Sequence, residues 1–201
     1  AAQDGMDVIG IGEMGIGNTT TSSAILSCLL HLPAEETVGR GGGVNDSGFA
    51  RKKQIIDDAI ARMQPDANDI VDVLSKVGGF DIAAMCGAFL GAAEMHLPVV
   101  VDGYISAVAA LCAHRINARC ADYCFASHVS AERGYALAIR EMNLKPMLLL
   151  EMRLGEGSGC PIAFEIIDSA LSVLRNMATF EEARIDDDYL AEIRAERRFQ
   201  R

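Results

Sequence analysis

The segment Leu97-Pro98-Val99-Val100-Val101-Asp102-Gly103 contains the clearest strand of this chain. Its β-branched run is apolar throughout and does not alternate with polar residues, which is typical of a strand buried on both faces of a parallel sheet. The run ends on an acid and a glycine. Because ligands of open α/β sheets bind beyond the carboxyl ends of the strands, we expect Asp102 and Gly103 to lie near a binding site.

Similar apolar runs predict further strands over 7–12, 123–126 and 147–152. Between them, apolar residues at helical spacing predict helices over 19–30, 50–63, 69–77, 81–95, 105–116, a stretch ending at 142, and 162–177. Asn18 or Thr19 is the expected N-cap of the first of these helices. Strands that alternate with helices predict an α/β fold, with a mostly parallel sheet flanked by helices on both faces. We expect one α/β domain over 1–180 and a charged helical tail over 181–201.

Composition excludes several classes of protein. The 201 residues are 50% hydrophobic and 23% charged, which excludes a disordered chain. A net charge of −10 disfavours a general nucleic-acid or anionic-membrane binder. Charged residues interrupt every apolar stretch before it reaches the ~18–20 residues of a membrane span. The polar, acidic start predicts no signal peptide, and its lack of an initiator Met is consistent with a fragment.

Six cysteines are scattered among apolar neighbours without a C-x-x-C pair, so we expect reduced core residues and no disulfide framework. One cluster is a metal candidate. It comprises Cys112, His114, Cys120, Cys124 and His128. Its spacing fits no standard zinc pattern, and the aromatic and β-branched residues around Cys124 indicate a strand that breaks the shared face. We therefore expect no metal site.

The first glycine-rich turn, between the strand over 7–12 and the next helix, matches two nucleotide motifs incompletely. Gly10-x-Gly12-x-x-Gly15 fits the dinucleotide fingerprint, but Glu13 would repel a pyrophosphate. The overlapping P-loop pattern has Asn18 in place of its lysine. Two interpretations remain open: backbone N–H groups at a helix start that hold one phosphate, or a tight turn without a ligand.

Two later features carry further chemistry. Gly39 to Gly48 are expected to form a second glycine-rich loop, and Lys52 or Lys53 could add positive charge for a phosphate. Glu156 stands between glycines, where a buried strand is expected to meet a helix N-terminus. It is a candidate general base, and a helix-capping acid is the equally open alternative.

Five motifs, taken together and in this order, resemble the nicotinate-nucleotide–dimethylbenzimidazole phosphoribosyltransferase family. They are GIGEMGIGNTT at 10–20, DVLSKVGGF at 72–80, VDG at 101–103, SHVSA at 127–131 and MRLGEGSG at 152–159. The resemblance covers nearly the whole chain. It implies a Rossmann-like fold, in agreement with the strand and helix pattern.

The resemblance also implies a reaction. Phosphoribose passes from nicotinate mononucleotide to dimethylbenzimidazole or a related azole, giving α-ribazole phosphate and nicotinate for the cobalamin lower ligand. Glu156 would be the general base, and no cofactor or metal is implied. The implied substrate-binding residues are Glu13, Met14, Gly15, Asn18, Thr19, Gly41, Lys52, Asp102, Gly103, Ser130, Leu154 and Gly155.

By the same resemblance we expect a cytoplasmic homodimer whose partners are the mononucleotide and the azole, and neither nucleic acid nor membrane. Family members are much longer, and this chain corresponds to their C-terminal, catalytic portion. By the resemblance, we expect this chain to lack the family's N-terminal segment, which carries base-binding residues. The alternatives are a non-catalytic mononucleotide-binding fragment that needs that missing half and, more distantly, a dinucleotide-binding oxidoreductase.

Overall fold

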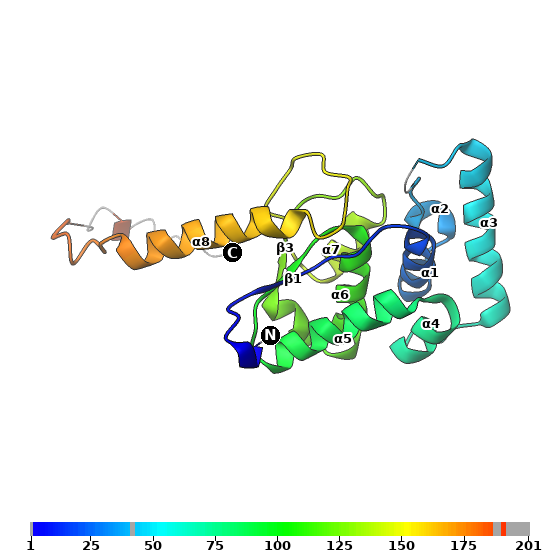
Figure 1. Ribbon diagram of the computed structural model, residues 1–201, viewed down its shortest axis with the longest axis horizontal. Coiled ribbons are helices and arrows are strands. Elements are labelled where there is room, and N and C mark those ends of the chain that lie inside the picture. The colour runs from blue at the N-terminus through cyan, green and yellow to red at the C-terminus, as the bar shows by residue number, and fades with distance from the viewer. Residues whose placement is uncertain (1, 41–42, 187–189, 192–201) are drawn as a thin grey trace. The chain divides into compact units, whose positions relative to one another are not determined.

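A computed structural model describes residues 2–40, 43–186 and 190–191, and the chain divides into two compact units, 1–164 and 165–201. The first unit holds a sheet of three parallel strands in the order β1-β2-β3 (Figure 1). These strands are β1 (Ile9–Ile11), β2 (Val99–Val101) and β3 (Cys124–Ala126). The predicted α/β fold with a parallel sheet is confirmed.

The position of β2 at the centre of the sheet accounts for its unbroken run of valines. Val99, Val100 and Val101 are all 0% exposed, and successive side chains of a strand point to opposite faces, so both faces of β2 are covered. Val99 and Val101 belong to the main hydrophobic core. On the other face, the Cys160 thiol lies 3.8 Å from the Val100 carbonyl oxygen. The first turn of the last helix therefore closes that face.

Eight α-helices and two short 3-10 helices are present in the described ranges. They are η1 (Ala2–Asp4), α1 (Asn18–Leu30), α2 (Ala34–Thr37), α3 (Asp46–Met63), α4 (Ile70–Val77), α5 (Phe80–Glu94), α6 (Tyr104–Ile116), η2 (Ala118–Tyr123), α7 (Tyr135–Glu141) and α8 (Gly159–Asn176). Helix α6 contacts α1, α5 and α7, and its residues 104–113 are all buried. It is the central helix of the core.

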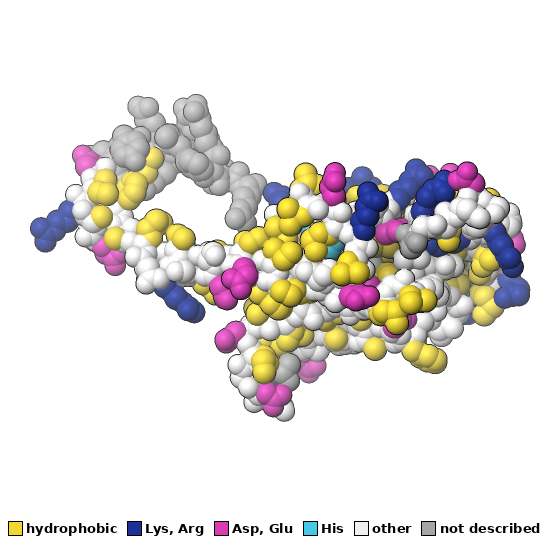
Figure 2. Space-filling view, turned by 45° about the horizontal axis from the view of Figure 1, so that its top comes forward, with side chains coloured by type: hydrophobic (Ala, Val, Ile, Leu, Met, Phe, Trp, Pro, Cys, Tyr) yellow, Lys and Arg dark blue, Asp and Glu magenta, His cyan; other side chains and the backbone are white. Residues whose placement is uncertain are grey.

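The surface of the first unit combines acidic and apolar side chains. Figure 2 shows hydrophobic side chains (yellow) interspersed with Asp and Glu (magenta), and Lys and Arg (dark blue) gathered toward one end of this unit. Phe80 at 96% and Val71 at 69% are among the most exposed large apolar residues. None of the helices in the described part of the chain combines the length and apolar character needed to cross a membrane.

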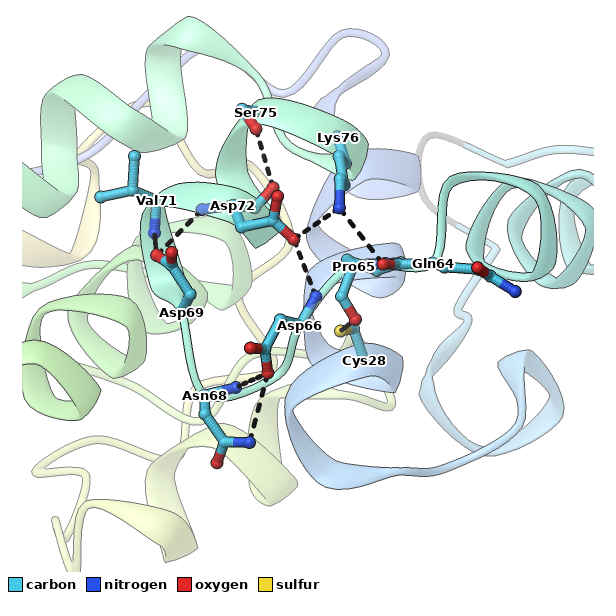
Figure 3. A network of polar contacts seen from close by, with 10 residues as sticks. All are labelled: Cys28, Gln64, Pro65, Asp66, Asn68, Asp69, Val71, Asp72, Ser75 and Lys76. Atoms are coloured by element: carbon cyan, nitrogen blue, oxygen red, sulfur yellow. Dashed lines mark hydrogen bonds and ion pairs between the residues drawn. The ribbon is translucent and has the colours of Figure 1, made fainter.

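A polar network fixes the start of α4 (Figure 3). The Asp69 carboxylate accepts hydrogen bonds from the backbone N–H groups of Val71 and Asp72, at 3.0 and 3.1 Å, which makes it the N-cap. Asp72 then accepts from Lys76 one turn later and from the backbone N–H of Asp66, both at 2.8 Å. The helix predicted over 69–77 is confirmed, and its cap is the residue at which the prediction began.

Two local predictions are wrong. The N-cap of α1 is Gly17, in the left-handed region at φ 85°, because the Asn18 side chain is engaged elsewhere in the site. The expected strand over 147–152 is reduced to one bridge between Leu148 and His128. Leu149 and Leu150 are 78% and 56% exposed, so this apolar run lacks a neighbouring strand beyond that bridge.

Helix α8 begins at Gly159, three residues before the predicted start at 162, with Pro161 in its first turn. In the second unit the helix continues to Asn176, and residues 180–184 form turns. The helical tail expected from Glu181 is therefore not formed over 181–186, while 187–189 and 192–201 lie outside the described residues. The division into a domain over 1–180 and a tail over 181–201 stays a prediction.

Candidate active site

The carboxyl ends of the three strands and the segment before α8 enclose a cavity of about 200 Å³. β1 leads into the first glycine-rich turn, β2 into Asp102 and Gly103, and β3 into Ser127 and His128. The lining residues are Glu13, Met14, Gly15, Ile16, Thr19, Gly103, Tyr104, Ile105, His128, Ser130, Glu132, Met152, Arg153, Leu154, Gly155 and Glu156. The site thus lies where ligands of open parallel sheets bind.

Two carboxylates line this cavity from loops that are joined by a hydrogen bond. The backbone N–H of Glu156 donates to the backbone carbonyl oxygen of Glu13 at 2.8 Å. Burial raises the pKa of Glu13; a hydrogen bond from Asn18 acts in the opposite direction, and nearby carboxylates, Glu156 among them, raise the pKa further. Glu156 itself is exposed. The arrangement can offer two proton acceptors of different surroundings to one ligand.

Asn18 holds the Glu13 side chain in place. Its Nδ2 donates to Glu13 Oε2 at 2.7 Å and to Asp81 Oδ2 at 2.9 Å, so one amide joins two carboxylates at the start of α1. Asn18 is itself buried and does not line the cavity. Asn18 therefore acts on the cavity through Glu13, whose side chain it holds.

A cationic side adjoins the carboxylates. Lys52 Nζ on α3 donates to Thr19 Oγ1 at 2.9 Å and to the Gly39 carbonyl oxygen at 3.3 Å. Burial lowers the pKa of Lys52, and the Glu132 carboxylate opposes that shift. Since Thr19 is in the first turn of α1, the ammonium lies beside the N-terminal end of that helix, which favours a phosphate.

A second cavity, of about 400 Å³, shares three lining residues with the first: Ser130, Glu132 and Arg153. It adds two further arginines, Arg40 and Arg133. A ligand that extends from one cavity toward the other would meet carboxylates near Glu156 and guanidinium groups near Arg153. The pair of cavities is thus suited to an elongated ligand with one anionic end.

His128, which the sequence suggested only as a metal ligand, lies at the cavity wall. It is 2% exposed, and its Nδ1 lies 2.9 Å from the Ser127 hydroxyl and 3.9 Å from Asp102 Oδ1. Burial lowers its pKa against the opposing effect of the Asp102 carboxylate, so the imidazole is neutral at neutral pH. Its sequence position, directly after a strand, was the signal that could have found it.

The structure brings nine of the expected site residues together in the cavity lining: Glu13, Met14, Gly15, Thr19, Gly103, Ser130, Leu154, Gly155 and Glu156. Asn18 and Lys52 lie behind the lining and contact it through hydrogen bonds to Glu13 and Thr19, whereas Asp102 is buried and accepts a hydrogen bond from Gly157, the neighbour of Glu156. Gly41 lies outside the described residues.

The expected list omitted several lining residues, chiefly Tyr104, Glu132, Met152 and Arg153. Met152 and Arg153 stand beside Leu154 in the motif around Glu156, so their position in the chain was a usable signal. Glu132 and Tyr104 gave no such signal, because a surface-like acid and an aromatic residue at a helix start have many ordinary explanations.

The cysteine and histidine cluster is divided between different elements. Cys120 lies in η2 and Cys124 in β3, and the Cys124 thiol donates to the Cys120 carbonyl oxygen at 3.2 Å. In the described ranges no group of three His, Cys, Asp or Glu residues is arranged to hold a metal ion. All six cysteines are free and buried, which confirms their predicted place in the core.

A family model described as phosphoribosyltransferase matches residues 1–185. The chain belongs to this phosphoribosyltransferase family. It is 53% identical over 196 residues to the nicotinate-nucleotide–dimethylbenzimidazole phosphoribosyltransferase of Clostridium perfringens (strain ATCC 13124), covering 98% of this chain and 54% of that protein. The enzyme of the same name from Chloroflexus aurantiacus (strain J-10-fl) is 45% identical, with 93% and 53% covered.

Solved structures of the family agree with the fold. The crystal structure of CobT from Thermus thermophilus superposes with a TM-score of 0.86 at 38% identity, covering 92% of this chain and 55% of that one. A second structure from the same organism, named as the same phosphoribosyltransferase, gives 0.84 at 36% identity. The chain spans about half the length of the relatives that it matches.

Proposed function

We propose that this chain carries the catalytic portion of an enzyme that transfers phosphoribose from nicotinate mononucleotide to dimethylbenzimidazole or a related azole. The products are nicotinate and α-ribazole phosphate, as required for the lower ligand of cobalamin. The observation that carries the proposal is the cavity in which Glu13 and Glu156 lie on hydrogen-bonded loops and Thr19, beside Lys52, belongs to the same lining. The names of the relatives support the same reaction.

The phosphate of the mononucleotide would bind at the start of α1. There, backbone N–H groups, the Thr19 hydroxyl and the Lys52 ammonium converge, with Ser130 on the same cavity wall. Gly15 and Gly103 leave room for close approach of the backbone to the ligand. Leu154 and Met14, 66% and 61% exposed, offer apolar surface for the azole ring.

Glu156 acts as the general base. As one azole nitrogen attacks the anomeric carbon, the bond from that carbon to the nicotinate nitrogen breaks and nicotinate leaves with its electron pair. The proton on the other azole nitrogen passes to the Glu156 carboxylate, which increases the nucleophilicity of the attacking nitrogen. Attack from the face opposite nicotinate gives the α-riboside. No metal or redox group is needed for this balance of atoms and electrons.

Glu13 supplies a second carboxylate to the site. Asn18 donates a hydrogen bond to its Oε2, and its pKa is raised chiefly by burial. Its place beside the Glu156 loop suits a polar contact to the ribose or stabilisation of the positive charge that develops at the anomeric carbon.

The decisive experiment replaces Glu156 by Gln and measures nicotinate release from nicotinate mononucleotide in the presence of dimethylbenzimidazole. We expect release to fall by about 100-fold or more while mononucleotide binding, measured by calorimetry, stays within a few-fold of the unchanged chain. Glu151→Gln is the matched control, because Glu151 is an exposed glutamate of the same segment that lines neither cavity. A Glu156→Gln variant that turns over normally would contradict the assignment.

The rival is a non-catalytic mononucleotide-binding fragment. It predicts binding without nicotinate release by the unchanged chain, whereas catalysis predicts release that depends on Glu156. Tight binding of a nicotinamide dinucleotide would instead favour the oxidoreductase alternative. We further propose that the protein works as a homodimer in the cytoplasm, as the resemblance implies.

A further inference from the structure

Asp102 is the most deeply buried acidic residue near the cavity, and its side chain does not line the cavity. It follows β2 directly and is 0% exposed, although the sequence suggested a substrate contact. A buried carboxylate is unfavourable unless hydrogen bonds satisfy it. Asp102 Oδ2 accepts the backbone N–H of Gly157 at 3.0 Å, and Oδ1 accepts that of Gly159 at 2.8 Å. Both oxygens of this carboxylate therefore bind the segment that carries Glu156.

That segment has an unusual backbone. Gly155, Glu156 and Gly157 follow one another in the left-handed region, with φ values of 74°, 58° and 73°. Glycine adopts this region freely, whereas a residue with a Cβ such as Glu156 is strained there. Strained backbone at a functional site persists only where the surrounding structure holds it. The hydrogen bonds from the loop to Asp102 and to the Glu13 carbonyl oxygen provide that hold.

Residues that follow the strands pack so closely against residues 155–159 that this segment has little room to take another position. A Cβ at Gly12, after β1, would lie 2.3 Å from the Gly157 nitrogen. A Cβ at Gly159 would lie 2.4 Å from His128 Nδ1 and 2.8 Å from Asp102 Oδ1. Gly159 is also the first residue of α8, so the Asp102 carboxylate caps that helix from a different part of the chain and benefits from its dipole.

We propose that Asp102 is a positioning residue: its carboxylate holds residues 155–159 in their left-handed conformation and thereby fixes where Glu156 presents its own carboxylate to the cavity. The hydrogen bonds do not depend on the reaction. Only the consequence for catalysis rests on the proposed function, in which Glu156 is the base.

The test compares Asp102→Asn with Ser127→Ala. Asparagine has nearly the same volume as aspartate, but its side-chain NH₂ group is a donor. It cannot accept the hydrogen bond that one of the two loop N–H groups donates to Asp102. Ser127 is the matched control, because its buried hydroxyl donates to the backbone carbonyl oxygen of Asp102 at 2.7 Å and leaves the carboxylate intact. We expect amide exchange of Gly157 and Gly159 to be about tenfold or more faster in Asp102→Asn and near the wild-type rate in Ser127→Ala.

Two further measurements keep the test decisive. The amides of Asp102 and Ser127 bond to β-strand carbonyl oxygens, at 3.3 and 3.0 Å, and their continued protection shows that the sheet is intact. In the unmodified chain, scalar couplings across the hydrogen bonds, from the nitrogens of Gly157 and Gly159 to the Asp102 side-chain carbon, detect the contacts even if a variant unfolds.

For catalysis we expect Asp102→Asn to lower kcat by about 100-fold with little change in KM for the mononucleotide, and to cause little further loss when Glu156 is already Gln. Absent couplings, or unchanged exchange at both glycines in a folded Asp102→Asn variant, would overturn the proposal. So would faster exchange with an unchanged kcat. If the unchanged chain releases no nicotinate, the proposed function fails, and the exchange and coupling measurements alone decide on Asp102.

Discussion

Lys52 is the cationic side chain to which the proposed function assigns the phosphate in this acidic protein. Its ammonium is half-buried and is held by the Thr19 hydroxyl and the Gly39 carbonyl oxygen, which are neutral partners that leave its charge available. Lys53, its neighbour in sequence, instead forms an ion pair with Glu35 and lies 4.7 Å from the centre of the Phe49 ring. Two adjacent lysines thus have different roles.

We predict that Lys52→Ala weakens nicotinate mononucleotide binding by about 10- to 100-fold, because a charge-assisted hydrogen bond to the phosphate is lost. Binding of dimethylbenzimidazole alone should change by less than about threefold on the same scale. Calorimetric titration of both ligands measures the difference, with Lys53→Ala as the control that leaves both affinities nearly unchanged. Equal losses for the two ligands would remove Lys52 from the phosphate site.

The pH dependence of Lys52 gives a second prediction. Burial lowers the pKa of its ammonium below the ordinary 10.5, so the folded protein loses this proton at a lower pH than the unfolded chain does. Between the two pKa values the unfolded chain binds more protons, and the contribution of Lys52 to stability therefore rises with pH. Mononucleotide affinity should fall in the same window, as measured by titrations between pH 7 and 10. A Lys52→Met variant should lack this fall.

At the residue scale, much of the candidate site could be predicted and the division of roles could not. Glu13 and Gly103 are cavity residues in strand-end loops, where the α/β pattern directs attention, and Glu156 is a cavity residue in the segment before α8. Nothing in the sequence distinguishes these from Asn18 and Asp102, which contact other protein groups and not open space. That distinction depends on contacts between segments more than 50 residues apart, which a linear pattern does not contain.

At the scale of elements, Gly12, which lies in the loop after β1 and packs against the segment before α8, differs sharply from glycines in helices. A Cβ at Gly12 would lie 2.4 Å from the Gly157 Cα, whereas at Gly87, on the exposed face of α5, no atom lies within 4 Å. We predict that Gly12→Ala lowers the free energy of unfolding by about 1–3 kcal/mol through overpacking and also reduces turnover. Gly87→Ala should raise the free energy of unfolding by about 0.5–1 kcal/mol through helix propensity.

Denaturant unfolding followed by circular dichroism measures both variants. A Gly12→Ala protein as stable and active as the unchanged chain would mean that the two loops do not pack as described. The pair is informative because both substitutions add the same methyl group, and only the surroundings differ.

The elements themselves were predicted well where periodicity is long and caps are explicit. Helix α4, helix α6 and the three strands all follow from local pattern. The run over 147–152 was misassigned because hydrophobicity marks a strand only where a neighbour exists to pair with it. Here only Leu148 has one. Pairing is a tertiary property, so composition alone could not decide it.

At the scale of the whole molecule, the net charge of −10 and the exposed apolar groove between α4 and α5 matter most. The charge opposes anionic ligands at long range, so the proposed function requires groups at the cavity itself to hold the mononucleotide. The groove is lined by Val71, Leu74, Phe80 and Ile116, of which Phe80 and Val71 are 96% and 69% exposed.

We predict that light scattering gives twice the 21.5 kDa of one chain, because pairing of two copies would cover this groove. Phe80→Asp should shift the mass toward that of a single chain. Met6→Asp, which also replaces an exposed apolar side chain, should not. A dimer that survives Phe80→Asp would mean that the two copies meet at another surface.

The six buried cysteines have a practical consequence. Burial raises the pKa of Cys86 to about 11 and those of Cys124 and Cys160 to about 12, so almost none of their thiolate is present near neutral pH. A thiol reagent can modify them only when the core opens. Cys86 lies in α5, Cys124 in β3 and Cys160 at the start of α8. The rate at which each of these three cysteines is labelled therefore measures how often its own element opens. Comparing the labelling rates of these cysteines would show which parts of the core open independently.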